Sequence, residues 1–415
     1  MEENKTLPKL WTRNFTIITL GSLVSLCGNA LSGFAMSLLV LDYTGSSFLY
    51  AIYVAVFTLP QIFMPVLSGA VLDRFSRRKT IYTLDYISSA LYLTAALILK
   101  SGAFSFPLLT VFVFFVGCIN SIYTVAYQSF YPLLITEGNF SRAYSIASVL
   151  ETLAAIVVPI SAFAYNSFGI VPLFLINAGC FFIAATAETR IDAEEHYLQE
   201  AKRSGPSRSR QMLTDIKEGF IYLASEKGLL AIGLYFFFCS LAGGASTAIA
   251  LPYFKAAFDN GEYVYMLVFG MNVLGRGIGG LYHYRHTISA RKKFTIALTV
   301  YLILSVIEAA YLYLPVPVMM GLYLTAGMLS VTSYNIRISA TQSYVPDGKK
   351  GRFNGAFTLL STLGTFFGEM AAGALAETIS MRAVVAGFML LNGVAAAAFI
   401  GGGKKYVKEI YNRQS

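Results

Sequence analysis

Twelve apolar stretches dominate this sequence, each close to the 20 or so residues that a helix needs to cross the hydrocarbon core of a membrane. They lie near 15–40, 48–72, 80–99, 106–130, 143–165 and 171–187, and then near 229–256, 263–284, 294–313, 317–343, 353–376 and 382–401. Charged residues make up only 13% of the chain, whereas soluble domains carry about 25%. We therefore predict an all-α membrane protein with twelve transmembrane helices.

The basic residues indicate how such helices would be oriented. If the N-terminus is cytoplasmic, 26 of the 31 Lys and Arg residues fall in inner segments, three in outer loops and two within spans. Lys and Arg accumulate in cytoplasmic loops, so we predict that both termini are cytoplasmic. Because the bases sit in separate loops and not on one face, the net charge of +9 does not indicate a nucleic-acid partner.

The cysteines and histidines show no metal-binding or disulfide pattern. Cys27, Cys118, Cys180 and Cys239 all lie in apolar stretches without the spacing of metal ligands. We interpret them as small packing residues and predict no metal site. The first apolar stretch is too long for the core of a signal peptide, so we expect it to stay as the first spanning helix.

The two halves of the chain repeat. Gln128-Ser-Phe-Tyr-Pro132 recurs as Gln342-Ser-Tyr-Val-Pro346, and a base opens the next span in each copy, at Arg142 and Arg352. A weaker third match pairs the segment that begins at Gly69 with the segment Gly280 to Arg285. Three matches at nearly the same offset, about half the chain length, predict two pseudo-symmetric six-helix bundles related by a parallel repeat.

The long polar segment 188–228 separates these bundles. We predict an N-terminal bundle at 1–187, a cytoplasmic linker at 188–228, and a C-terminal bundle with a short cytoplasmic tail at 229–415. Within the linker, Met212 to Ala224 has apolar residues at helical spacing, which predicts an amphipathic helix on the membrane surface.

One short connection, Gly69 to Lys79, concentrates charge between two apolar stretches. Its charged members are Asp73, Arg74, Arg77, Arg78 and Lys79. A positive-inside loop alone would explain the bases. The order of residues, a Gly, an Asp four residues on, an Arg and then a basic cluster, also resembles the signature loop between helices 2 and 3 of major facilitator superfamily transporters, with Ser76 where that family usually has Gly. The resemblance implies that Asp73 and its basic neighbours act as an inner latch on the outward-open state.

Further motifs resemble one bacterial branch of this superfamily, the macrolide-efflux proteins and enterobactin exporters. They are Leu39 to Ser46, Thr341 to Asp347 and Gly351 to Gly355. That branch commonly has an acid after the Gly in the middle of helix 1, where this chain has Gly28-Asn29. The resemblance implies the major facilitator fold, with helices 1, 4, 7 and 10 lining a cavity and helices 5 and 8 packing across the bundles.

Five ionisable residues lie deep within predicted spans, where each costs about 2.5–3.5 kcal/mol to insert. They are Glu151, Arg276, Glu308, Arg337 and Glu369. Carried over from the family, Glu151 and Arg276 form a candidate pair between bundles, and Arg337 is a candidate cavity cation. Glu151 has two interpretations: a carboxyl whose proton occupancy couples to transport, or a permanently ionised partner of an Arg.

Glu369 and Glu308 also each have a functional and a structural interpretation. Glu369 follows Gly364 and Gly368, whose spacing predicts tight helix packing, and is a candidate for coupling or for structure. Glu308 lies seven residues before Pro315 and is expected near the outer interface, mainly as a structural group.

Uncharged polar and aromatic residues on the family's cavity helices are candidates for contact with substrate, although each could instead bridge helices. They are Asn29, Phe34, Asn120, Tyr123, Tyr127, Gln128, Phe238, Tyr334 and Asn335. Tyr323 is a further candidate for an aromatic wall that would contact amphiphiles.

No phosphate-binding loop and no catalytic arrangement can be identified from spacing, so we predict a protein that is not an enzyme and has no cofactor, with a proton gradient as its energy source. We expect a monomer in the bacterial inner membrane that exports drug-like or siderophore-like amphiphiles by alternating access. The alternatives are an importer of an anionic metabolite, a lysophospholipid flippase, and a non-transporting sensor or scaffold.

Overall fold

The computed structural model describes residues 9–65, 75–102, 105–136, 139–193, 195, 208–285 and 288–413. Nearly all of these residues are helical, and none of them forms a strand. Ten of the described helices are long and apolar enough to cross a membrane. They are α1 (Arg13–Thr44), α2 (Ser47–Thr58, with its apolar span continuing to Pro65), α4 (Arg77–Lys100), α5 (Phe106–Phe130), α7 (Ile170–Glu188), α10 (Lys227–Ala257), α11 (Gly261–Arg285), α12 (Lys293–Ala310), α13 (Val316–Tyr344) and α15 (Met381–Ala395).

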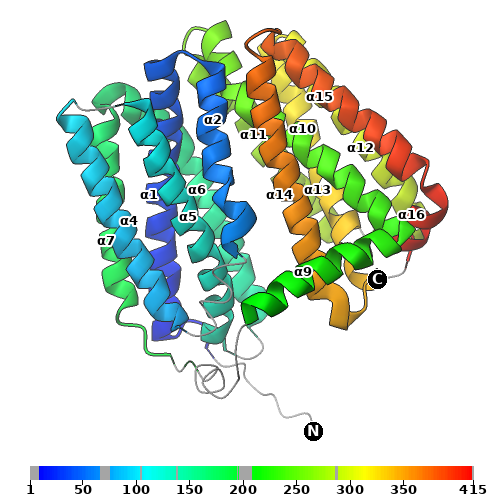
Figure 1. The fold of residues 1–415 in the computed structure, drawn as a ribbon, viewed down its shortest axis with the longest axis horizontal. Coiled ribbons are helices and arrows are strands. Elements are labelled where there is room, and N and C mark those ends of the chain that lie inside the picture. The colour runs from blue at the N-terminus through cyan, green and yellow to red at the C-terminus, as the bar shows by residue number, and fades with distance from the viewer. Residues whose placement is uncertain are drawn as a thin grey trace. The chain divides into compact units, whose positions relative to one another are not determined.

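Two further helices of 29 residues each, α6 (Phe140–Phe168) and α14 (Asp347–Leu375), bring the long helices to the predicted twelve within the described ranges (Figure 1). The shorter elements are the 3-10 turns η1 (Tyr131–Leu134), η2 (Ala290–Lys292) and η3 (Tyr311–Tyr313), the π-helical turn η4 (Ala396–Gly401), and the helices α9 (Arg208–Ser225) and α16 (Lys404–Tyr411). The all-α membrane fold is therefore confirmed.

Local sequence signals set several helix ends. Thr12 caps α1 by accepting a hydrogen bond from the Phe15 N–H, and α1 ends at Gly45, whose φ of 60° is the left-handed conformation that glycine adopts most readily. Ser76 caps α4 by accepting from the Lys79 N–H. The residue that departs from the family's usual glycine is thus the one that begins this helix.

The helices group into two compact units, which we describe separately. The N-terminal unit comprises Met1–Gly45 and Leu59–Arg210, and the C-terminal unit comprises Ser46–Thr58 and Gln211–Ser415. Helix α2 packs on α14 and α10 and so belongs to the C-terminal unit, a placement that the sequence repeat does not predict.

Glycines allow close helix packing in the C-terminal unit. A Cβ at Gly368 of α14 would overlap the main-chain carbonyl of Leu241 in α10, and one at Gly244 of α10 would overlap the carbonyl of Thr365. The predicted tight packing at Gly364 and Gly368 is confirmed. Glycines also bring α11 and α13 together, with Gly275 against Leu324 and Gly327 against Asn272.

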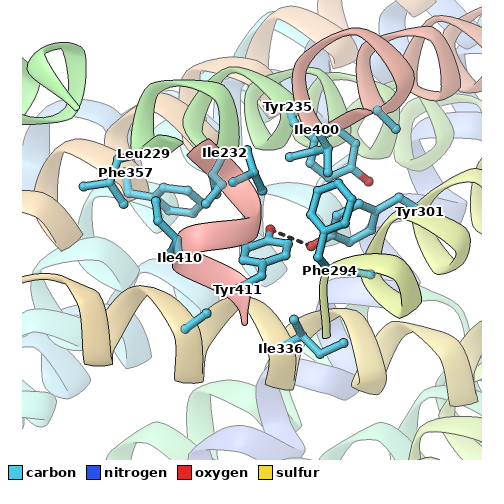
Figure 2. Close-up of a cluster of buried hydrophobic side chains, with 14 of the residues drawn as sticks. Leu229, Ile232, Tyr235, Phe294, Tyr301, Ile336, Phe357, Ile400, Ile410 and Tyr411 are labelled. Atoms are coloured by element: carbon cyan, nitrogen blue, oxygen red, sulfur yellow. Dashed lines mark hydrogen bonds between the residues drawn. The ribbon is translucent and has the colours of Figure 1, made fainter. Parts of the chain in front are cut away.

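The hydrophobic core of the C-terminal unit is closed by its last helix, α16 (Figure 2). Tyr411 of α16 and Tyr301 of α12 are both buried, and their hydroxyls are 2.9 Å apart in a hydrogen bond. Asn412 accepts from the Phe294 N–H and donates to the Arg291 carbonyl. The end of the described chain is therefore fixed to the beginning of α12.

The predicted amphipathic segment is helical, as α9. Gly219 of α9 lies against the main chain of Arg352 at the beginning of α14, and Leu223 is buried in the same core. An ion pair joins Glu218 Oε2 to Arg352 Nη1 at 2.7 Å, but both side chains are about half exposed, so it contributes at most about 1 kcal/mol. The apolar face of α9 holds it to the unit.

Candidate functional site

The N-terminal unit contains two acidic side chains in contact with each other inside the bundle. Helix α4 carries Asp85 two turns from its start, and α7 ends at Glu188. Because α4 packs along α7, the two carboxyls lie side by side, and each side chain is only 1% exposed. An acid pair inside a helix bundle is costly and is a strong candidate for a functional site.

Hydroxyl groups lie on the helices beside this pair. Helix α1 carries Thr19, Ser22 and Ser25 at three-residue spacing, all at least 95% buried, and Ser25 lies beside Asp85. The Tyr123 hydroxyl of α5 lies near Ser22 and the two carboxyls. These six residues form what we call the acid cluster: Thr19, Ser22, Ser25, Asp85, Tyr123 and Glu188.

Several buried polar atoms of the acid cluster lack a hydrogen-bond partner among the described residues. Asp85 Oδ2, both Glu188 oxygens and the hydroxyls of Tyr123 and Ser25 have no hydrogen-bond partner among the described residues. Buried polar groups are normally bonded. The cluster combines four hydroxyl groups with two carboxyls. Such groups can bind a proton or a water molecule.

Close packing of α1 on α7 holds the cluster in place. A Cβ at Gly21 would lie 3.1 Å from Glu188 Oε1. About two turns further along, Gly28 lies against Asn177, whose side-chain amide donates to Ser32 at 2.6 Å. The small residues of α1 thus allow α7 to bring Glu188 into the bundle.

The described part of the charged signature loop begins α4. The main-chain N–H groups of Arg77 and Arg78 donate to Glu195 Oε1 at 2.8 and 3.3 Å, so a carboxylate lies at the positive end of the helix dipole. The Arg77 guanidinium donates to the Ser129 carbonyl, and that of Arg78 donates to the Ile191 carbonyl. Gly69, Asp73 and Arg74 lie outside the described residues, so the latch stays a prediction.

In the C-terminal unit, Arg337 of α13 lies in an aromatic cage. Its guanidinium carbon is 4.9 Å from the ring centres of Phe236 and Phe357 and 5.5 Å from that of Tyr334. The Arg337 Nε is buried and has no hydrogen-bond partner among the described residues. The rings stabilise the cation, while its hydrogen-bonding capacity is only partly used.

Two further acids that the sequence identifies as candidates, Glu308 and Glu369, lie in the C-terminal unit. Glu308 of α12 accepts a hydrogen bond from the Tyr323 hydroxyl at 3.3 Å. Glu369 of α14 is 2% exposed and accepts from the Thr58 hydroxyl of α2 at 3.2 Å, while its Oε2 lacks a partner within the described ranges. Glu369 therefore links α14 to α2.

The remaining candidates differ in how far they are exposed. Asn120 and Gln128 of α5, Tyr334 and Asn335 of α13, and Arg276 of α11 are exposed within their units, whereas Asn29 and Phe34 of α1 are partly buried. Tyr127 stacks between Tyr123 and Tyr131, at ring separations of 6.0 and 5.2 Å. The Glu151 side chain lies outside the described set, so its pairing with Arg276 stays a prediction.

Two aromatic candidates pack within the C-terminal unit. Phe238 packs against the core of the C-terminal unit and stacks on Phe399, with ring centres 5.9 Å apart. Tyr323 is 2% exposed, because its ring packs on Tyr311 and Phe269. An aromatic residue can lie on any face of a membrane-spanning helix, so the sequence gives no signal that separates these positions from a cavity wall.

Sequence reasoning missed the acid pair. Asp85 was the one acid within the predicted span 80–99, and that was the available signal. Glu188 stood at the first position of the predicted linker, where a charge needs no explanation. Their contact depends on how α4 packs against α7, which no periodicity indicates.

An assembly of membrane-length helices with buried ionisable groups is the architecture of a polytopic transport protein. The chain belongs to the Major Facilitator Superfamily, whose family model matches residues 18–369. It is therefore a multi-pass membrane transporter by family and fold, as the signature loop predicted.

Three curated relatives are similar in sequence. The uncharacterized MFS-type transporter YkuC of Bacillus subtilis (strain 168) is 23% identical over 65% of this chain, which spans 64% of YkuC. The uncharacterized MFS-type transporter YfiS of the same organism is 26% identical over 81% of this chain and 80% of its own length. Macrolide efflux protein A of Streptococcus pyogenes is 26% identical over 65% of this chain and 66% of its own length.

Solved structures share the fold. A D-xylose-proton symporter matches with a TM-score of 0.72 at 13% identity, covering 97% of this chain and 99% of the symporter. A bacterial homologue of the iron transporter ferroportin, in an inward-facing state, matches with a TM-score of 0.67 at 16% identity, covering 94% of this chain and all of that one. These similarities establish the architecture alone.

Proposed function

We propose that this transporter exports an amphiphilic small molecule, of a drug-like or siderophore-like kind, across the bacterial inner membrane by alternating access, in exchange for protons. The observation that carries the proposal is the similarity to macrolide efflux protein A over about two thirds of both chains. Macrolides are large and amphiphilic, so this relative favours a cargo of that class.

The side chains exposed within each unit suit such a cargo. Helix α5 presents the amides of Asn120 and Gln128, and α13 presents Tyr334 beside Asn335. Binding sites for small molecules combine apolar or aromatic surface with a few polar groups that fix orientation. Neutral amides next to tyrosine rings would accept amphiphiles without requiring one particular charge.

Flux measurements test this function. Purified protein in proteoliposomes would be given a macrolide, a catecholate siderophore and a sugar, each with and without an imposed pH gradient. We expect gradient-dependent movement of at least one amphiphile and none of the sugar. Movement of the sugar alone, or no movement of any amphiphile, would contradict the proposal.

The cage around Arg337 favours a second candidate, a transporter of anionic amphiphiles such as lysophospholipids or organic acids. The guanidinium is held by rings and has no carboxylate within salt-bridge distance among the described residues. Its donors could bind the carboxylate or phosphate of a cargo. In this case Arg337 would bind the anionic group of the cargo and would not serve helix packing.

Substitution of Arg337 separates the two candidates. For an anionic cargo, we expect Arg337→Gln to reduce transport of an anionic lipid probe at least tenfold, with partial recovery in Arg337→Lys, because lysine keeps the charge but not the planar donor fork. Transport of a neutral macrolide is the internal control. Equal losses for both probes would indicate a packing role for Arg337 instead.

A further inference from the structure

The acid cluster contains more negative charge than its surroundings can compensate if both acids are ionised. Asp85 and Glu188 are each 1% exposed and lie against each other. Two carboxylates in contact repel each other, and burial removes the water that would screen them. A proton between the two oxygens turns this repulsion into a hydrogen bond, as in pairs of carboxyls that share one proton.

Among the side chains that the structure describes, the ones found beside the pair are neutral. Helix α1 presents Ser25 and Ser22, and α5 presents Tyr123. Helix α6, which packs on α1 and α7, has Tyr165, and this residue donates to Asp42 of α1. The other charged or titratable side chains of α6, those of Arg142, Tyr144 and Glu151, lie outside the described set.

The nearby bases at the beginning of α4 are bound elsewhere. The Arg78 guanidinium donates to the Ile191 carbonyl, and that of Arg77 donates to the Ser129 carbonyl. Both residues precede Asp85 by about two helical turns, which corresponds to roughly 10 Å along the axis. Both guanidinium groups donate to main-chain carbonyls, so we expect a bound proton, and not an arginine, to compensate the negative charge of the pair.

We propose that Asp85 and Glu188 share one proton and form the proton-binding site of this transporter. Binding of the proton changes the charge of the pair from −2 to −1, and the hydroxyls of Ser25 and Tyr123 stabilise the charge that remains. No group of three or more His, Cys, Asp or Glu side chains that could hold a metal ion occurs among the described residues.

The same helices connect the pair to the candidate substrate surface. Tyr123 belongs to the acid cluster, and its ring stacks on Tyr127, at 6.0 Å between ring centres. A substrate that displaces Tyr127 would shift Tyr123 and change the solvation of the pair. This coupling step rests on the proposed function, whereas the shared proton itself does not.

Infrared spectroscopy tests the shared proton without transport. We expect the purified protein at neutral pH to show a protonated-carboxyl band that is absent from the double variant Asp85→Asn/Glu188→Gln and unchanged in Asp192→Asn. Asp192 is an exposed acid four residues after Glu188. In Tyr123→Phe, the band should shift in frequency and persist.

An absence of any band difference between the wild type and the double variant would overturn the shared proton. So would a carboxylate signal that responds to Na⁺ or Ca²⁺ in place of pH, because the pair would then hold a metal cation. Both isosteric changes preserve side-chain shape, and the Tyr123→Phe shift gives a second readout if the double variant does not fold.

Transport assays test the coupling role. In proteoliposomes, we expect Asp85→Asn and Glu188→Gln to reduce pH-gradient-driven accumulation at least tenfold, while substrate exchange without a gradient stays within twofold of the wild type. Asp192→Asn should match the wild type in both assays. Full gradient-driven accumulation in either pair variant would overturn the coupling role. A wild type that ignores the gradient would instead contradict the proton-driven function, and the infrared band would still decide the site.

Discussion

At the scale of single residues, Tyr411 shows how one buried hydroxyl joins two elements of this protein. Tyr411 and Tyr301 share a hydrogen bond inside a core of aliphatic and aromatic side chains (Figure 2). Burial raises the pKa of the Tyr411 hydroxyl above its usual range. It therefore stays neutral at physiological pH and can act as both donor and acceptor.

We expect Tyr411→Phe to lower the free energy of unfolding of the protein by about 1–3 kcal/mol, because the Tyr301 hydroxyl is left buried without its partner. Denaturant titration in detergent measures the change. The control is Tyr406→Phe on the same helix, where the side chain is 40% exposed. Equal stabilities of the two variants would show that the hydrogen bond contributes nothing.

The stability that Tyr411 confers should also depend on pH in one direction. Its raised pKa means that the unfolded protein loses the proton first, so stability is constant at neutral pH and falls as the pH rises past about 10, the pKa of an unperturbed tyrosine. The alkaline fall should be smaller in Tyr411→Phe than in the wild type. An equal fall in both would assign it to other groups.

Which residues matter could be predicted only in part from the sequence. Arg337 and Glu369 were identified because a charge within an apolar stretch is conspicuous, and both are set among specific partners. Asp85 and Glu188 were missed because their importance comes from their contact, which is a property of the packed helices. Tyr123 was identified as a candidate for substrate contact, yet its hydroxyl lies in the acid cluster.

At the scale of helices, the packing of α10 on α14 depends on glycines. We expect Gly368→Ala to destabilise the protein by about 1–3 kcal/mol, because the new methyl group would overlap the Leu241 carbonyl and push the helices apart. Thermal unfolding in detergent measures this. Gly355→Ala, on the same helix with nothing within 4 Å of the new Cβ, should be neutral or slightly stabilising. A similar loss in both variants would point to backbone effects and not to packing.

Helix existence and length were well predicted, since membrane thickness fixes the length of an apolar run. The predicted span 171–187, for example, is α7 at Ile170–Glu188. Helix partners were harder to predict. Helix α2 is apolar on all sides, so its sequence gives no preferred face, and its packing on α14 could not be foreseen. The glycine spacing of α14 was the exception, because it marks the contact face directly.

At the scale of the whole molecule, the internal repeat is visible in the structure. The two copies of the Gln-Ser motif lie at corresponding places, with Gln128 near the end of α5 and Gln342 near the end of α13. Each copy is followed by a proline and then by a helix of 29 residues, α6 or α14. Sequence similarity at half-chain spacing therefore reports equivalent positions in two bundles, although the assignment of α2 departs from a simple division.

The orientation of the protein in the membrane follows from the distribution of its bases, and labelling can test it. Because inner segments hold 26 of the 31 Lys and Arg residues, we expect the tail to be cytoplasmic and the turn after α4 to be external. The four native cysteines, none of which forms a disulfide, would first be replaced by serine or alanine. An impermeant maleimide should then label Ser101→Cys in intact cells and Lys405→Cys only after permeabilisation, since both sites are exposed on opposite sides of the predicted topology. The reverse pattern would place the basic loops outside, and the charged beginning of α4 could then no longer act as an inner latch.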